Sequence, residues 1–286
     1  MQVGCQMAFS DVTSPTYIAE AGRVVEEIGF HSLWVPEHVM FFAAYDSEYP
    51  YSADGRLPGD PRSLLDPFSA LTFVAANTAT IKLCTGVCLV PQRNPIYCAK
   101  QVADLDYLSG GRFEFGIGIG WLKEEFDALG VPWKGRATRL LECLEVMKTL
   151  WGDEVSSYNG KHFSFESAFQ NPKPVQKPHP PLIFGGESDP ALKRVAAIGQ
   201  GWYGFNLTPE RLKSALDTLD ALLDAEGRTR DQVKIYITPA ADAQDSNSLK
   251  QFSALGVEQI ILPVFANDPK KLHDRATAIH DLVASA

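Results

Sequence analysis

The segment at residues 81–119, IKLCTGVCLVPQRNPIYCAKQVADLDYLSGGRFEFGIGI, contains one complete repeat of the pattern that decides the fold. We expect a buried strand over residues 81–87, a helix over residues 95–108 and a second apolar strand over residues 112–119. Two strands joined by a helix-length crossover are typical of a parallel pair, because the helix then covers one face of the sheet. The segment therefore predicts a βαβ unit.

The same pattern continues along the rest of the chain. Further strands are expected over residues 3–9, 32–37, 181–185, 201–205, 233–238 and 259–264. Helices follow them, for example over residues 15–28 and 209–225, the second opened by Thr208 as N-cap with proline at the first helical position. An open doubly wound sheet usually has fewer strands and a glycine-rich first turn. Eight strand–helix units therefore predict an α/β fold, a (β/α)8 TIM barrel, over residues 1–286 as a single domain.

Two stretches interrupt the repeat and are interpreted as insertions after strand 2 and before strand 5. The first, residues 40–66, is rich in Tyr, Pro, Gly and Asp, and the second, residues 154–177, contains a predicted hairpin around Asn159-Gly160. Long loops in compact domains are usually lids or binding loops. We expect the first insertion to cover a ligand with its aromatic side chains, which are Phe41, Phe42, Tyr45, Tyr49 and Tyr51. Such a cluster can equally pack against the barrel or against a second subunit.

Composition and charge exclude several classes of function. A formal net charge of -9 disfavours nucleic acid and acidic membrane surfaces as partners, and leaves a small-molecule substrate. No apolar run approaches the roughly 20 residues of a membrane span, and the N-terminus has no secretory pattern, so we expect a cytoplasmic protein. The five cysteines are scattered, which argues against disulfides and a metal site and predicts buried thiols: Cys5, Cys84, Cys88, Cys98 and Cys143.

Active sites of such barrels lie at the C-terminal ends of the strands, and the first candidate there is Glu37-His38. A histidine at a strand end can donate or accept a proton near neutral pH. The alternative is a histidine that satisfies loop carbonyls. Position alone leaves both interpretations open.

Glycines mark three other strand ends. Gly86 and Gly118 allow backbone to approach a flat ligand, and Gly86 also suits a bulge or an unusual peptide geometry. Gly186, Glu187 and Ser188 precede a helix whose N-terminus would attract phosphate. The alternative for Ser188 is an ordinary N-cap, and the Glu187 carboxylate would repel an anion if its side chain faced one.

Taken together and in this order, these segments resemble the luciferase-like monooxygenase superfamily, over nearly the whole chain. The most specific stretch is KQVADLDYLSGGRFEFGIGIGWLKEEFDALG at residues 100–130, supported by GFHSLWVPEH, LCTGVCLVPQRNP and PLIFGGESDPALKRVAAIGQGWY. The resemblance implies a (β/α)8 barrel with a flavin-type ring at its C-terminal mouth, and a homodimer. For site residues it implies His38 beside the reactive ring with Glu37 in support, a non-prolyl cis peptide at Gly86-Val87 following Thr85, Gly118 and Trp121 along the cofactor's tail, and Gly186, Glu187 and Ser188 at its phosphate.

The cofactor depends on the branch. Many FMN-using members of the superfamily carry an arginine at the end of strand four, where this chain has Ile119. The motifs PEHV, YPYSADGRLPGDP, TGVCLVPQRNP and GIGIGW are similar to the branch that uses the deazaflavin coenzyme F420. The leading hypothesis is hydride transfer between coenzyme F420 and a small organic substrate, with His38 as proton donor or acceptor. The alternatives are an FMN-dependent monooxygenase supplied by a partner flavin reductase, and a non-catalytic flavin-binding protein.

Overall fold

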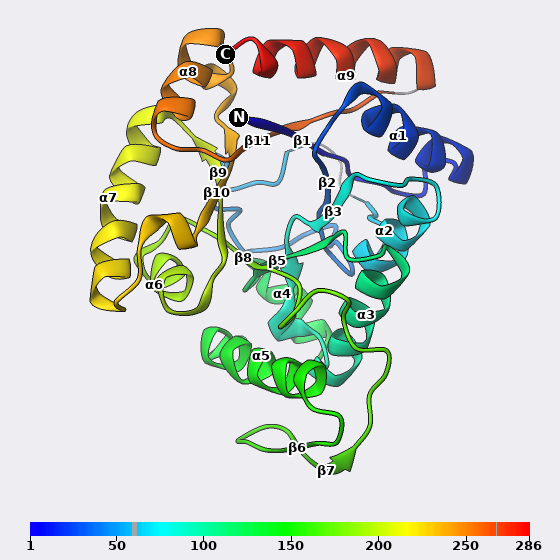
Figure 1. Ribbon diagram of the computed structural model, residues 1–286, viewed down its shortest axis with the longest axis vertical. Helices are drawn as coiled ribbons and strands as arrows, with labels where there is room; N and C mark the ends of the chain where they lie inside the picture. The colour runs from blue at the N-terminus through cyan, green and yellow to red at the C-terminus, as the bar shows by residue number, and fades with distance from the viewer. Residues whose placement is uncertain (59–61, 267) are drawn as a thin grey trace.

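The computed structural model describes residues 1–58, 62–266 and 268–286. Eight strands of the described chain run parallel in a ring, and the last pairs with the first, so the barrel is closed (Figure 1). They are β1 (Gln2–Gln6), β2 (Ser32–Val35), β3 (Lys82–Thr85), β5 (Phe113–Gly118), β8 (Leu182–Gly185), β9 (Gly201–Leu207), β10 (Lys234–Pro239) and β11 (Gln259–Pro263). The predicted (β/α)8 barrel is confirmed, with strand ends that differ from the predicted ones by at most three residues.

Helices surround the ring. They are α1 (Pro15–Ile28), α2 (Pro67–Ala75), α3 (Pro95–Leu108), α5 (Arg136–Gly152), α6 (Asp189–Ile198), α7 (Pro209–Ala225), α8 (Ser246–Ala254) and α9 (Pro269–Ala284), with short helices α4 (Lys123–Ala128), η1 (Val90–Gln92), η2 (Arg230–Gln232) and η3 (Ala241–Ala243). The starts of α1, α3 and α7 follow from sequence, because Ser14, Asn94 and Thr208 each accept a backbone N–H and proline follows each cap. No described helix is long and apolar enough to cross a membrane.

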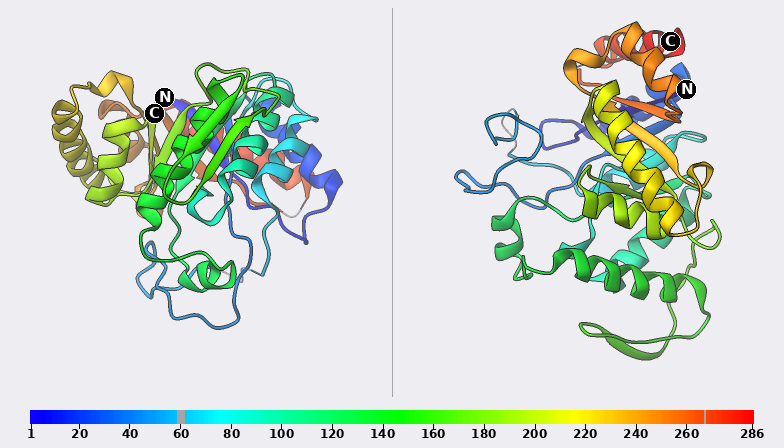
Figure 2. Two further views of the ribbon diagram at one scale, coloured as in Figure 1. Left: turned by 90° about the horizontal axis from the view of Figure 1, so that it is seen from below. Right: turned by 90° about the vertical axis from the view of Figure 1, so that its left-hand side faces the viewer.

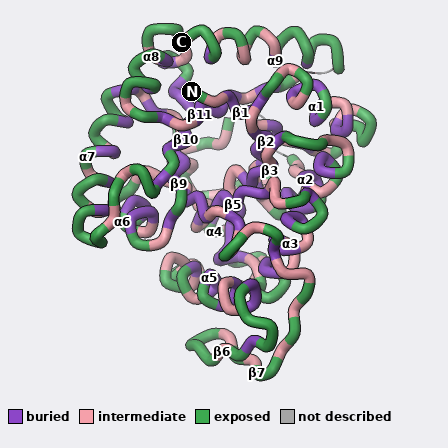
Figure 3. The backbone as a smooth tube through the Cα atoms, in the orientation of Figure 1, coloured by how far each residue is buried: buried purple, intermediate pink, exposed green. Residues whose placement is uncertain are grey.

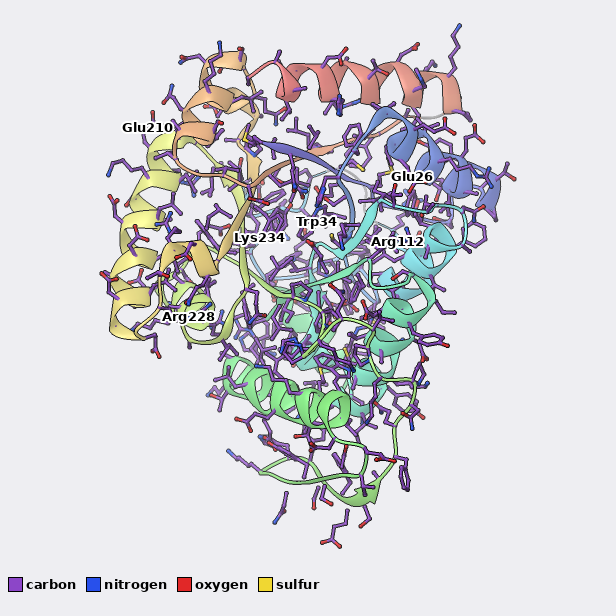
Figure 4. The ribbon with its side chains drawn as sticks, viewed as in Figure 1. Glu26, Trp34, Arg112, Glu210, Arg228 and Lys234 are labelled. Atoms are coloured by element: carbon purple, nitrogen blue, oxygen red, sulfur yellow. The ribbon has the colours of Figure 1, made fainter. Side chains whose placement is uncertain are left out.

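Side chains fill the barrel interior. Trp34 lies at its centre (Figure 4), with its ring centroid 5.0 Å from that of Tyr203 and 5.6 Å from that of Tyr236. Most residues of the eight barrel strands are buried (Figure 3). All five cysteines are free and buried, as predicted. The barrel is therefore a packed core, and a ligand can enter only at an end.

A bulge interrupts the strand after β3. Cys84 pairs with Glu114 and Cys88 pairs with Ile117. Three residues therefore lie between the paired positions on this strand and two on β5, so this strand has one extra residue. The strand then resumes as β4 (Cys88–Leu89). The Gly86-Val87 peptide bond inside the bulge is cis, as the resemblance implied.

The two insertions lie in different places (Figure 2). Residues 39–58, here named the lid, project from the same side of the barrel as α4; residues 59–61 of the predicted insertion lie outside the described residues. The second insertion forms the predicted hairpin, β6 (Ser156–Asn159) and β7 (Ser164–Ala168), which packs outside α5, where the Tyr158 hydroxyl donates to Glu145 at 2.8 Å. The expectation that a long insertion serves a binding site thus applies to the lid, whereas the hairpin covers a helix.

Candidate active site

A large cavity of about 1390 Å³ opens at the C-terminal ends of the strands and beneath the lid. Gly86, Gly118 and Gly186 all line it, so the three predicted strand ends meet at one mouth. Typical small-molecule pockets occupy roughly 300–1,000 Å³. The mouth therefore has room for a cofactor and a substrate together.

His38 lines this cavity with both ring nitrogens already engaged. Its Nδ1 lies 3.0 Å from Oε2 of Glu125, and its Nε2 lies 3.1 Å from the indole Nε1 of Trp121. An indole nitrogen can only donate, so Nε2 accepts and the ring proton sits on Nδ1, facing Glu125. In this arrangement His38 has no nitrogen free to exchange a proton with a ligand.

Glu125, on α4, organises this cluster, and its side chain is fully buried. Its oxygens also accept the backbone N–H of Val39 at 2.6 Å and the amide of Gln92 at 2.8 Å. Burial raises the pKa of Glu125, but the hydrogen bonds from His38, Gln92 and Val39 outweigh burial, and the pKa is lowered. Glu125 therefore holds His38 and the start of the lid in place as an anion.

Both carboxylate oxygens of Glu37 accept hydrogen bonds from neighbouring residues. Its Oε2 accepts the N–H of Leu89 at 2.5 Å and its Oε1 accepts Nε of Arg93 at 2.7 Å. Arg93 in turn pairs with Asp66 at 2.6 Å. Both carboxylate oxygens of Glu37 thus fix the loop after β4, and the geometry favours a positioning role over direct chemistry.

The bulge forms one wall of the mouth. A Cβ built on Gly118 would lie 2.6 Å from Cγ2 of Val87, so the Val87 side chain occupies the space that the glycine leaves open. Thr85 is fully buried, and its hydroxyl donates to the carbonyl of Gly116 at 2.7 Å. Val87 therefore faces the cavity, whereas Thr85 supports the strand pair behind it.

The next part of the mouth, beyond β5, is the turn from β8 into α6. Gly186 adopts a φ of 105°, which a side chain would strain, and it turns the chain toward the helix. Ser188 is the N-cap of α6 but makes no capping bond with its hydroxyl, which remains available at the cavity. Glu187 points its carboxyl away from the helix, and Oε1 accepts the N–H of Phe205 at 2.7 Å.

Two arginines complete this side of the cavity, Arg194 from α6 and Arg136 from the start of α5. Nε of Arg194 is buried and finds no partner among the described residues. The Arg136 guanidinium lies 3.5 Å from the ring centroid of Trp133. Burial lowers the pKa of both guanidiniums, and the charge of Arg136 lowers that of Arg194 further. Two neighbouring cations with no ion pair to a described carboxylate make a site for an anion.

Comparison with known proteins gives the family. The family model described as luciferase-like monooxygenase matches residues 4–278. This chain belongs to the luciferase-like monooxygenase family. The chain is similar in sequence to the uncharacterized protein Rv0953c of Mycobacterium tuberculosis. The two are 33% identical over 272 residues, which cover 93% of this chain and 92% of the relative.

Solved structures similar to this luciferase-like chain include enzymes with different cofactors. An F420-dependent secondary alcohol dehydrogenase, solved with an F420-acetone adduct, has a TM-score of 0.76 and 17% identity, covering 99% of this chain and 98% of its own. The oxygenating constituent of 3,6-diketocamphane monooxygenase from Pseudomonas putida, solved with FMN, has a TM-score of 0.78 and 14% identity, with the same coverage. At these identities the likeness concerns the fold.

The residues predicted from sequence fall into two groups in this luciferase-like site. Most of them line the cavity, namely Glu37, His38, Gly86, Val87, Gly118, Trp121, Gly186, Glu187 and Ser188. Thr85 lies behind it. Sequence reasoning missed Glu125, Arg136 and Arg194. The first could have been suspected because WLKEE places carboxylates directly after a strand end, but nothing in the sequence brings Arg136 and Arg194 together.

Proposed function

We propose that this chain is an oxidoreductase that binds coenzyme F420 at the barrel mouth and moves hydride between it and a small organic substrate. The observation that carries this proposal is Ile119, which lies at the end of β5 and packs against the hydrophobic core. An arginine would be expected at this position in many FMN-using members of the family. Without it, the strand end offers an apolar surface to the ligand.

The residues at the mouth fit a deazaflavin. The orphaned Nε of Arg194 and the uncapped hydroxyl of Ser188 offer donors to its phosphate, together with Arg136 and the N-terminus of α6. Val87 and Gly118 leave a shallow wall against which a flat ring can lie. When bound, the deazaflavin supplies hydride transfer and does not activate oxygen. His38, held by Glu125 and Trp121, shapes the wall beside the ring.

A second candidate is an FMN-dependent monooxygenase supplied by a partner flavin reductase. The pair of Arg136 and Arg194 favours it, because two guanidiniums match the double charge of a terminal phosphate. A third candidate is a flavin-binding protein without catalysis.

The homodimer and the cytoplasmic location stay predictions. Sedimentation of the purified protein would test whether it is a dimer.

Calorimetric titration of the cofactor-free protein with coenzyme F420 and with FMN separates these candidates. We expect the deazaflavin to bind at least about tenfold more tightly, a difference of roughly 1.4 kcal/mol that one charge-assisted hydrogen bond can supply. Ile119→Arg should then raise the affinity for FMN and leave that for coenzyme F420 nearly unchanged. Equal or tighter binding of FMN by the unaltered protein would replace the first candidate with the second, and binding of neither would remove both.

A further inference from the structure

The lid meets the barrel at Glu187. The Tyr51 side chain lies beside the Glu187 carboxyl, which accepts the N–H of Phe205 at 2.7 Å. The rings of Tyr51 and Phe205 lie 4.9 Å apart, and the Asn206 amide donates to the carbonyl of Tyr51 at 3.4 Å. We name the part of the cavity around Glu187 and Tyr51 the lid pocket. Its polar centre is one carboxyl group and one phenol.

Burial disfavours charge in the lid pocket. Burial raises the pKa of Glu187 above its ordinary value, although the N–H of Phe205, the Tyr51 hydroxyl and the charge of Arg211 on α7 oppose it. Burial likewise raises the pKa of Tyr49 to about 12 and raises that of Tyr51. A neutral carboxyl group is an oxygen acid that can both donate and accept a hydrogen bond.

The surroundings of the lid pocket are aromatic. The ring centroid of Tyr51 lies 4.9 Å from that of Phe205 and 5.5 Å from that of Tyr49, and all three residues line the cavity. The cationic side chains that line the cavity come from other elements. Arg136 belongs to α5 and Arg194 to α6, and Lys123, on α4, forms an ion pair with Asp127 at 2.5 Å. A ligand group in the lid pocket therefore meets aromatic surface, the Glu187 carboxyl and the Tyr51 phenol.

We infer that the lid pocket takes an uncharged, hydrophobic substrate with a carbonyl or hydroxyl group, and that Glu187 exchanges a proton with the oxygen of that group while Tyr51 holds it. This inference rests on the proposed hydride transfer. His38 is poorly placed for the same task, because Trp121 already donates to its Nε2. Glu187 is thus a catalytic residue in a site where His38 is a positioning residue.

The chemistry balances with the reduced deazaflavin as reductant. The carbon of a carbonyl substrate receives the hydride, and with it two electrons, while its oxygen takes the proton of the Glu187 carboxyl. The C=O double bond becomes a C–O single bond, with one new C–H bond and one new O–H bond. Glu187 is left as a carboxylate and regains its proton from water. Alcohol oxidation runs through the same groups in reverse.

Binding of three probes of one shape tests the substrate class. We would titrate the protein, with and without bound cofactor, with cyclohexanone, cyclohexanecarboxylate and cyclohexylammonium. The neutral ketone should bind at least about tenfold more tightly than either ion. Tyr51→Phe should weaken ketone binding by roughly three- to tenfold, the effect of one neutral hydrogen bond. Tyr97→Phe, at a side chain that is 75% exposed on α3, is the matched control and should change nothing.

Glu187→Gln then tests the proton. A glutamine amide still donates a hydrogen bond but has no proton to give, so ketone affinity should stay within about threefold while the rate of ketone reduction falls by roughly two to four powers of ten. A charged probe that binds as well as the ketone overturns the substrate class. A wild-type protein that binds cofactor and ketone but passes no hydride, or a Glu187→Gln protein with an unchanged rate, overturns the proton step. Failure of the cofactor itself to bind is a different result and contradicts the proposed function.

Discussion

The two sides of the barrel mouth differ in how far their polar groups are satisfied. At the ends of β2 and β5, Glu125, His38 and Trp121 supply one another with hydrogen bonds. At the start of α6, Nε of Arg194 has no partner among the described residues, and Ser188 leaves its hydroxyl unused. An unpaired buried polar group costs free energy that a ligand can recover. The comparison therefore assigns the first side to holding the shape of the site and the second side to holding a ligand.

The largest effect should come from the satisfied side. Glu125→Ala removes the acceptor of His38, Val39 and Gln92 and leaves these buried donors unpaired. We expect the free energy of unfolding to fall by about 3–5 kcal/mol, the usual loss when one member of a buried charged network is removed. Urea denaturation followed by circular dichroism measures it.

The neighbouring residue on α4 is the control. Glu124 accepts bonds from the lid at Asp46 and Ser47 but lies close to the surface, so Glu124→Ala should cost about 1 kcal/mol or less. If both substitutions cost the same, the buried network has no special role in the fold and the contrast between the two sides weakens.

On the unsatisfied side, affinity and stability should move in opposite directions. Arg194→Met removes a donor to the cofactor phosphate, so the affinity for the preferred cofactor should fall by roughly ten- to a hundredfold. The same change removes an unpaired group and its repulsion by Arg136, so the ligand-free protein should be as stable as wild type or more stable. Calorimetry and thermal unfolding measure the two quantities.

Arg228 provides the matched comparison at the other end of α6 (Figure 4). Its guanidinium donates to the carbonyls of Val195, Ala196 and Gly199. Arg228→Met should therefore destabilise the protein and leave the cofactor affinity of the folded fraction unchanged. Loss of stability without loss of affinity in Arg194→Met would mean that Arg194 supports the fold and binds nothing.

His38 tests whether the satisfied side takes part in the chemistry. His38→Ala removes one of the donors to Glu125 and leaves the indole N–H of Trp121 without its acceptor, and we expect a loss of about 1–3 kcal/mol in the free energy of unfolding, with weaker cofactor binding. A proton carrier would behave differently. Were the turnover rate to fall by roughly two to four powers of ten with stability and cofactor affinity intact, His38 would be the proton carrier and the assignment to Glu187 would fail.

The sequence was sufficient for the fold because its determinants are local. Alternating apolar segments and caps such as Thr208 set the elements, and short crossovers allow few topologies, so the eight strands could be predicted. Strand ends were also informative about the site, since parallel strands bring Gly86, Gly118 and Gly186 to one mouth.

The contacts within the site could not be predicted in the same way. Arg194 and Arg136 are 58 positions apart on separate helices, and neither follows a strand directly. The partners of His38 depend on how α4 docks, which is a property of side-chain packing. Glu187 was expected to oppose an anion if it faced one, and the structure turns its carboxyl toward Phe205 and the lid, which removes the conflict with a phosphate at Ser188.

The smallest expected effect concerns the proton on Glu187. Its pKa is raised in the folded protein from an ordinary value of 4.5, so the stability it contributes is present below about pH 4.5 and is lost as the pH rises through the folded pKa. Glu187→Gln does not titrate, so the stability of wild type relative to this variant should fall as the pH rises from 4.5. Glu26, on α1 and far from the mouth (Figure 4), has a lowered pKa, because three backbone N–H bonds outweigh its burial; wild type should therefore lose stability relative to Glu26→Gln as the pH falls. Thermal unfolding over this pH range compares the two slopes. Parallel curves for wild type and Glu187→Gln would mean that Glu187 is ionised when folded, and the lid side of the mouth would then hold a charge rather than a transferable proton.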